Sequence, residues 1–526
     1  MSTGDASAAR LTFKAGAVAP TADPIPATSR RAWRALLVGV AAVAFASRLV
    51  PVLRGGGLFG LIGYDGGVYY AAGAGLAHGL SPYVDFLLLH PPGIVLALLP
   101  FGLLGRVLGH PEAMAVARLA WMLLGTVSAL LVAATLRQRG LVAALVGGLL
   151  YAVWVPAIFV ERTTTLEAVT GVLTLGAVWL LARAAPEAST PLTPLTTLTT
   201  RAAVVAGLLL GASCATKIWG VAPLLAVVVW CAVEHGRRRA VALALGAGAS
   251  TVAICLPFFL MAPRVMWDMV VGAQLDRVRV AVDWYTKAVD TAGLSQVPGA
   301  VAPLLVVVTL LLAAAVVLAA RSRVGRLAIV LLVVGLALLA ASPAWTVDYA
   351  SLVAGPVALL AGQASGVVTA ALSRVAALRV VAVVLALAGV AAYAALSAPH
   401  TRFGPSFAGR TMGTLVAQAP GCVTSDDPTA LIEAGVFDRN IQRGCPLMVD
   451  LGGYSYYLRP GADLQVSRAR NEQWQRFTLD YLASGRAAVV VRFELGVGLS
   501  PSTRTTIESW PALGTAGRFT IRQPPR

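Results

Sequence analysis

The residues best suited to chemistry gather in one polar loop that follows the first long apolar segment of the chain. Asp65 and Tyr69 are four residues apart and would share one face of a helix. Asp85 and His90 follow in the same loop. A carboxylate held partly away from water at a membrane surface is suited to accept a proton from a hydroxyl group. Asp65 is therefore the candidate general base, although its position also fits an ordinary solvated or helix-capping acid.

The composition indicates what surrounds this loop. Of 526 residues, 58% are hydrophobic and 12% are charged, and the mean hydropathy is +0.78. A soluble domain carries about 25% charged residues. Apolar runs of about 20 residues, the length that a helix needs to cross the hydrocarbon core, recur between positions 34 and 398. A membrane barrel would alternate apolar and polar residues instead. The sequence predicts an α-helical polytopic membrane protein.

The net charge of +17 is explained by the way the chain is oriented in the membrane. The arginines stand in short clusters between the apolar runs, the pattern of cytoplasmic loops, and this argues against a nucleic-acid partner. The clusters are Arg30 to Arg34, Arg137 and Arg139, Arg237 to Arg239, Arg321 to Arg326, and Arg374 and Arg379.

Placing these clusters in the cytoplasm predicts about eleven crossings of the cell membrane within a domain covering residues 33–398. A disordered cytoplasmic leader, 1–32, precedes it, and external loops are expected at about 53–113 and 261–299. The expected spans are about 34–52, 114–136, 140–160, 167–184, 201–215, 218–234, 239–260, 300–320, 327–342, 349–365 and 379–397.

The apolar segment 91–108 is not counted among the spans. Pro100 in its middle and Arg106 near its end disfavour a regular transmembrane helix. Counting it would also place Arg137 and Glu161 on the wrong sides of the membrane. We expect a helix that lies at the outer interface or is re-entrant.

Residues 399–526 have a different composition, with more charges and shorter apolar runs. Segments 447–450 and 487–491 are typical of buried strands, and 468–483 of an amphipathic helix. We expect a small extracytoplasmic α/β domain. Cys422 and Cys445 are its only cysteines, and on the oxidising side of the membrane they are expected to form a disulfide.

The run YDGGVYYAAGAGLAHGLSPYVDFLLLHPPG, which contains Asp65, resembles the first external loop of the GT-C superfamily of polytopic glycosyltransferases. Protein O-mannosyltransferases and lipid A aminoarabinose transferases are the members that it resembles most. The resemblance implies a sugar donor carried on a polyprenyl phosphate and a catalytic Asp in this loop, which Asp65 matches. The family usually has an Asp-Glu pair, whereas Gly66 follows Asp65 here.

The resemblance extends to later segments. Glu167, or as a second choice Glu161, matches an acidic position that supports the catalytic acid or a divalent metal ion. Arg118 and the "G…TK..G" hairpin around Lys217 match basic positions, and Asp348 lies in a segment similar to the one that faces the lipid donor. Glu167 also fits a favourable charge at a helix start, and Lys217 a side chain that reaches the interface.

A departing phosphate leaves negative charge that nearby cations stabilise. Arg118 and Lys217 are the first candidates, followed by Arg277 and Arg279 in the second external loop. Tyr69 and His90 are expected to line the same site.

Three functions are compatible with the sequence. The first is a glycosyltransferase that moves a sugar from a polyprenyl-phosphate donor, with inversion, to an extracytoplasmic cell-wall glycan, glycolipid or protein. The second is a transporter or flippase, which would place ionisable residues or broken helices near the midplane of several spans. The third is a non-catalytic cell-envelope assembly protein, in which Asp65 would be dispensable.

The predicted sidedness has a direct test. A cysteine introduced near residue 110 is expected to react with a membrane-impermeant thiol reagent added from outside, because segment 91–108 does not cross. Labelling only after the cytoplasm is opened would contradict this topology and invert every later loop.

Overall fold

The computed structural model describes residues 30–184, 198–275, 277, 282–295, 297, 299, 301–397, 405–417, 419–458, 466–493 and 498–525. The expected leader lies outside them except for its last residues, Arg30 to Ala32, which open the first helix.

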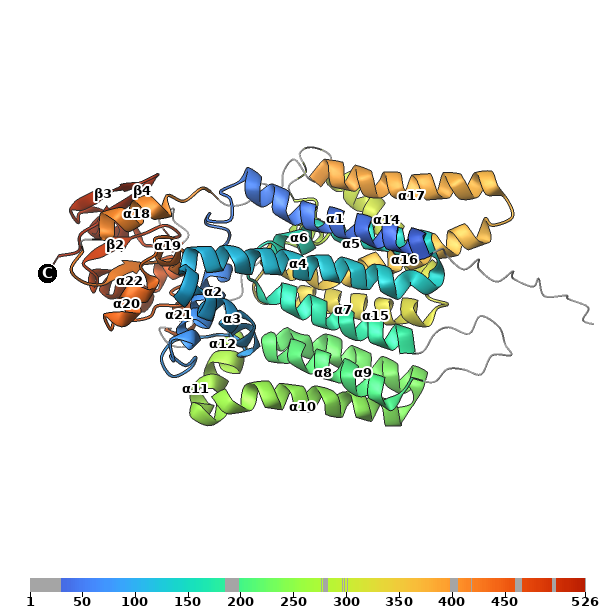
Figure 1. Cartoon of the computed structure of the whole chain (residues 1–526), viewed down its shortest axis with the longest axis horizontal. Coiled ribbons are helices and arrows are strands. Elements are labelled where there is room, and N and C mark those ends of the chain that lie inside the picture. Colours follow the sequence, from blue (N-terminus) through green and yellow to red (C-terminus); the bar gives the residue numbers. More distant parts are fainter. Residues whose placement is uncertain are drawn as a thin grey trace, which may run out of the picture.

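A bundle of long apolar helices makes up most of the described chain (Figure 1). Nine of them are long and apolar enough to cross a membrane, or ten if a bent pair is one span, and α8 is a shorter apolar helix. With α8 included, they correspond to the eleven predicted segments. The helices are α1 (Arg30–Arg54), α4 (His110–Leu136), α5 (Leu141–Val153) with α6 (Val155–Glu161), α7 (Leu166–Ala184), α8 (Thr200–Thr216), α9 (Val221–His235), α10 (Arg237–Met261), α14 (Val301–Ala319), α15 (Arg323–Ala341), α16 (Ala354–Ala371) and α17 (Ala376–Ser397).

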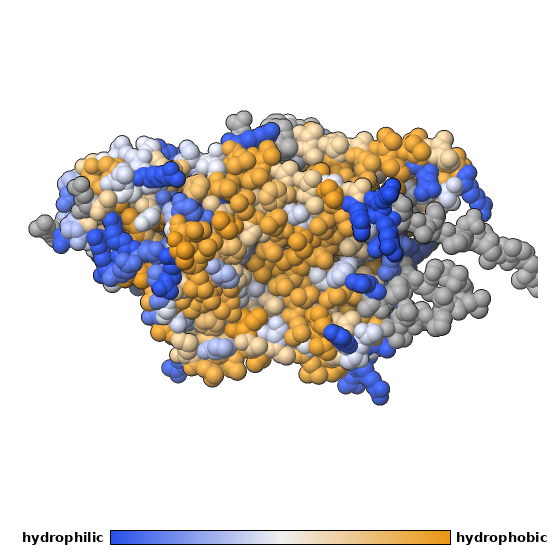
Figure 2. All heavy atoms as spheres, viewed as in Figure 1, coloured by the Kyte–Doolittle hydropathy of each residue, from blue (hydrophilic) through white to orange (hydrophobic). Residues whose placement is uncertain are grey.

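The outer surface of this bundle matches a lipid environment. Figure 2 shows a broad hydrophobic band over the helices, with hydrophilic residues gathered toward both ends of the molecule. Only 6% of the apolar window in α14 and in α17 is buried by other parts of the protein. In water such exposed apolar helices would be unstable, so the predicted membrane fold class is confirmed.

Two short helices, α2 (Asp65–Ala77) and α3 (Gly93–Leu108), form the first loop. They lie at the end of the bundle that meets the C-terminal domain (Figure 1). Their contact is close because glycines face it: a Cβ on Gly73 would lie 2.7 Å from that of Leu98, and a Cβ on Gly102 would lie 2.7 Å from the Gly73 carbonyl oxygen. With 16 residues, α3 is shorter than the helices that can span.

Short elements follow α10 and precede α16 at the same end. They are α11 (Pro263–Trp267), the π-helix η3 (Asp268–Gly272), α12 (Ala273–Leu275), α13 (Trp284–Thr291) and the 3-10 helix η4 (Val347–Val353).

The C-terminal domain is a four-stranded mixed sheet, ordered β1-β2-β4-β3, with helices around it. Strands β1 and β2 are parallel, and the other pairs are antiparallel. The elements are α18 (Gly409–Val416), β1 (Val423–Ser425), α19 (Pro428–Glu433), α20 (Phe437–Gln442), α21 (Tyr454–Tyr457), α22 (Glu472–Ala483), β2 (Ala487–Val489), α23 (Pro501–Glu508), β3 (Ala512–Ala516) and β4 (Phe519–Arg522).

Two local predictions in this domain have different outcomes. Cys422 and Cys445 are joined in a disulfide, with their Cα atoms 5.7 Å apart. The predicted strand at 447–450 is wrong, because this segment is an irregular loop. Its apolar residues are buried by packing against other elements, with Leu447 and Val449 in the cluster around α2, so burial rather than strand pairing explains the apolar run.

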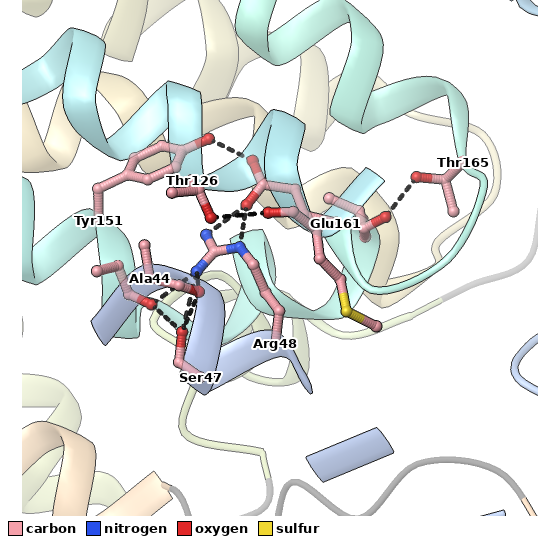
Figure 3. Close-up of polar contacts among 10 residues, drawn as sticks. Ala44, Ser47, Arg48, Thr126, Tyr151, Glu161 and Thr165 are labelled. Carbon is pink, nitrogen blue, oxygen red and sulfur yellow. Dashed lines mark hydrogen bonds and ion pairs between the residues drawn. The ribbon is translucent and has the colours of Figure 1, made fainter. Parts of the chain in front are cut away.

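A buried ion pair holds the bent span together (Figure 3). The Nε of Arg48 in α1 donates to the Glu161 carboxylate at 2.9 Å, and its Nη2 donates to the same oxygen. Tyr151 donates to the other carboxylate oxygen at 2.7 Å. Gly125 leaves room for the pair, since a Cβ there would lie 2.3 Å from the Arg48 Nε. The pair ties α1 to α6 where α5 and α6 meet at 59°.

Candidate active site

A cavity of about 370 Å³ lies between the helical bundle and the C-terminal domain. Seven of the nine residues expected at the site line it. They are Asp65, Tyr69, His90, Glu167, Lys217, Arg277 and Asp348. These residues come from segments spread over nearly three hundred positions, so the fold has brought distant polar residues to one place.

Asp65 is the first residue of α2 and faces this cavity. Two glycines let the start of the helix fit tightly between neighbours. A Cβ on Gly66 would lie 2.3 Å from the Thr163 hydroxyl oxygen, and one on Gly67 would lie 2.0 Å from that of Thr429. Thr164 donates to the Gly66 carbonyl oxygen at 2.7 Å. Position 66 therefore has no room for a side chain as the chain is folded here.

The Asp65 side chain is exposed to the cavity, and the protein around the cavity encloses it in part. This enclosure, followed by the nearby charges of Asp450 and Glu167, raises the pKa of Asp65 to about 6. Arg277 and Arg492 act in the opposite direction. The two neighbouring carboxylates raise the pKa in the same direction as the enclosure does. The group is then a stronger base than an ordinary aspartate and still ionises near neutral pH.

Lys217 and Glu167 form a pair beside Asp65. The ammonium group lies 2.5 Å from the Glu167 Oε1 and faces the rings of Trp219 and Tyr349, at 5.0 and 4.7 Å from their centroids. Lys217 is extended backbone between α8 and the 3-10 helix η2 (Ile218–Gly220), so its side chain leaves the hairpin tip and enters the cavity.

Arg277 approaches from the segment after α12. Its Nη1 donates to the Tyr349 hydroxyl at 2.6 Å, and its guanidinium lies 5.0 Å from the centre of the Tyr456 ring. Asp348, in η4, also lines the cavity. Lys217 and Arg277 are thus both held against Tyr349, with their charges on one side of the cavity.

His90 has its ring packed edge-on against Tyr69, at 5.6 Å between centroids. Tyr83 donates to its backbone carbonyl oxygen at 2.6 Å. Burial, and then the charges of Lys217 and Arg277, lower the pKa of His90 well below its usual value. The imidazole is therefore neutral, and its buried Nδ1 has no hydrogen-bond partner within the described residues.

The C-terminal domain contributes residues that the sequence analysis did not identify. Asp450, Tyr456, Arg468 and Arg492 all line the cavity. Asp450 accepts a hydrogen bond at 3.1 Å from Tyr64, the residue that precedes Asp65 in the sequence. No sequence signal indicates these residues, because they follow Asp65 by 385 to 427 positions and stand in short helical turns or irregular segments.

Three residues that the sequence analysis named as site candidates are not seen at the cavity. Arg118 is buried in α4, where it pairs with Glu433 at 3.2 Å and donates to the Leu58 carbonyl oxygen, and it does not line the cavity. Arg118 lies two turns into α4, on the face of that helix that contacts α19. Arg279 lies outside the described residues. Glu161 is bound to Arg48, so of these two glutamates only Glu167 lines the cavity.

The cavity acids do not make a metal site by themselves. One Glu167 oxygen is occupied by Lys217. Among the described residues, no three metal-ligating side chains of the cavity approach one another closely enough to share an ion.

An apolar groove opens from the cavity into the helical bundle. Its volume is about 80 Å³, and residues of α7, α9, α15 and α16 line it. Glu167, Lys217, Trp219 and Tyr349 belong to both spaces. A polar chamber and a membrane-embedded groove thus meet at Lys217.

Solved structures with a similar fold are known. ArnT from Cupriavidus metallidurans bound to undecaprenyl phosphate is similar over 94% of this chain and 98% of its own, with a TM-score of 0.57 and 17% identity. The apo oligosaccharyltransferase of Archaeoglobus fulgidus is similar over 93% of this chain and 74% of its own, with a TM-score of 0.60 and 15% identity.

The chain has a GT-C fold. At these identities the likeness is one of fold. No protein-family model and no curated protein matches the sequence. The GT-C fold agrees with the resemblance of the first loop, and in this chain it gathers the residues around Asp65.

The close approach at Gly67 yields a test of how Asp65 is held. Gly67→Ala is expected to destabilise the protein by roughly 1–3 kcal/mol, because the new Cβ meets Thr429. Thermal unfolding in detergent measures this. Gly67→Ala with Thr429→Ala should recover part of the loss, since the hydroxyl in contact is removed.

Gly39→Ala in α1 is the matched control. No atom lies within 4 Å of a Cβ at Gly39, so this change should be neutral or slightly stabilising. Equal losses from Gly39→Ala and Gly67→Ala would contradict the packing argument.

Proposed function

We propose that this protein is a membrane glycosyltransferase that moves a sugar from a polyprenyl-phosphate donor to an acceptor outside the cytoplasm. The observation that carries the proposal is the junction at Lys217. There, a polar cavity containing Asp65 meets an apolar groove within the membrane helices. A donor with a charged head and a lipid tail has this same division between polar and apolar parts.

The known ligands of proteins with this fold support the donor class. The ArnT structure contains undecaprenyl phosphate, and an oligosaccharyltransferase AglB structure contains dolichol phosphate. By analogy, the lipid tail of the donor occupies the groove between α7, α9, α15 and α16. Its phosphate lies beside Lys217 and Arg277, whose positive charges face the cavity.

The reaction follows from this placement. The acceptor hydroxyl oxygen attacks the anomeric carbon while the bond from that carbon to the phosphate oxygen breaks. Asp65 accepts the hydroxyl proton, and the polyprenyl phosphate leaves with the bonding electrons. Lys217 and Arg277 stabilise the charge on the leaving phosphate. Attack opposite the leaving group inverts the anomeric configuration.

The neighbouring residues position these groups. Glu167 holds the Lys217 ammonium, and Tyr349 holds the Arg277 guanidinium. Neutral His90 and Tyr69 form one wall of the cavity. Arg468 and Arg492 cover the cavity from the C-terminal domain, so that domain is part of the acceptor side.

Asp65→Asn tests the role of the base. The amide cannot accept the proton, so we expect a loss of about 10²–10⁴-fold in kcat, with purified protein still folded. The assay is sugar analysis of the envelope in a strain without the native gene, followed by transfer from the lipid donor in vitro.

Asp85→Asn is the control, because Asp85 caps a local turn by accepting from the Ser81 amide at 2.7 Å and lies outside the cavity. It should retain activity. Full glycosylation by well-expressed Asp65→Asn protein would exclude Asp65 as the base and would favour a transporter or an assembly role.

The raised pKa of Asp65 sets the pH dependence. A general base acts in its ionised form, so kcat/KM should rise with pH through about 6 and then level off. An ordinary aspartate would give a profile that is already flat above pH 5. A rate that falls as pH rises from 5 to 7 would contradict the assignment.

A further inference from the structure

Two of the five histidines of the chain meet an aspartate far from the candidate active site. His78 follows the last residue of α2, His110 opens α4, and Asp438 lies in α20 of the C-terminal domain. Both histidine Nε2 atoms lie 2.7 Å from the same Asp438 oxygen. In the part of the chain that the structure describes, this is the one group of three or more metal-type ligands within 4.8 Å.

The backbone holds the three side chains in place. Gly79, with a φ of +84°, turns the chain just after His78, and Arg106 donates to the Ala77 carbonyl oxygen at 3.1 Å. The His110 ring lies edge-on to Phe437, with centroids 5.0 Å apart. Gly105 leaves the space for that ring, since a Cβ there would lie 2.2 Å from its Nδ1. The cluster is therefore built into the contact between α3, α4 and α20.

Tyr70 orients the His110 ring. Its hydroxyl lies 3.0 Å from the His110 Nδ1, and two carbonyl oxygens, those of His110 and Phe101, lie 3.3 and 3.5 Å away. The nearest of these atoms is the His110 Nδ1, so its hydrogen bond with the hydroxyl fixes the ring with the Nε2 toward Asp438. The Nε2 of His78 reaches the same Asp438 oxygen, so two imidazole nitrogens and one carboxylate oxygen converge on one small space.

We propose that His78, His110 and Asp438 bind one divalent transition-metal ion, and that the ion is zinc. Two imidazole nitrogens and one carboxylate oxygen are a common zinc ligand set. Tetrahedral ligand atoms around zinc are roughly 3.3 Å apart, so Asp438 moves outward by about half an ångström on binding. The Asp438 side chain is 33% exposed, which leaves a path for the ion and a fourth position for water.

The site joins the two parts of the protein. His78 and His110 belong to the membrane domain and Asp438 to the C-terminal domain, so the ion links them. It is separate from the catalytic cavity, because the 13 residues of α2 place His78 roughly 20 Å from Asp65. The ion would clamp the far end of the helix that presents Asp65, and the inference does not depend on the proposed reaction.

The test uses the full chain purified in detergent. The protein is stripped with a chelator and titrated with Zn²⁺ and with Co²⁺, while metal content and thermal unfolding are measured. We expect one zinc per chain, visible Co²⁺ absorption of four-coordinate type, and a higher unfolding temperature with zinc. His78→Gln and Asp438→Asn should weaken binding at least tenfold. Tyr70→Phe should weaken it about tenfold and keep the stoichiometry.

His235→Gln is the control, since His235 is a histidine of α9 outside the cluster, and binding should be unchanged. The wild-type measurements stand even if a variant fails to fold. Wild-type protein that binds no zinc or cobalt would overturn the proposal, as would unchanged zinc affinity in both His78→Gln and Asp438→Asn. The unfolding temperature could instead be unchanged by zinc and by chelator, and decrease as the pH is raised from 5 to 8. That result would identify a protonated histidine–aspartate pair in place of a metal site.

Discussion

The ion pair between Arg48 and Glu161 constrains the membrane domain from within. A charge among apolar helices is stable only with a partner, and this pair satisfies the Glu161 carboxylate from Arg48 and Tyr151. The pair joins α1 to the end of α6. The threonines that follow Glu161 then reach α2, where Thr164 binds the Gly66 carbonyl oxygen beside Asp65. The position of the candidate base therefore depends on a contact made inside the bundle.

The contacts between the bundle and the C-terminal domain are as important for the cavity. Arg118 binds Glu433, and Tyr64 binds Asp450. Burial raises the pKa of Glu433 to about 7, although Arg118 opposes this, so the contact depends on a buried and costly group. These bonds hold the C-terminal domain where its Arg468 and Arg492 line the same cavity as Asp65. The C-terminal domain thus completes the cavity, and a membrane domain alone would leave Asp65 open to water.

Sequence reasoning was accurate where one physical property dominates. Long apolar runs with arginines between them predict spanning helices, because crossing lipid requires both length and apolarity. It was inaccurate where the outcome depended on partners. Arg118 has the residue type of a phosphate ligand, yet its face of α4 meets Glu433. The apolar segment 447–450 is buried by packing against other elements, without strand pairing.

By itself, the sequence determined the membrane class, the apolar spans, the loop containing Asp65 and the pairing of Cys422 with Cys445, because each depends on local composition or on a small number of candidates. Only the tertiary structure decided which charged residues share a cavity with Asp65, that position 66 has no room for a side chain, and that His78 and His110 meet Asp438. These are contacts between positions up to several hundred residues apart, and periodicity and composition carry no information about them.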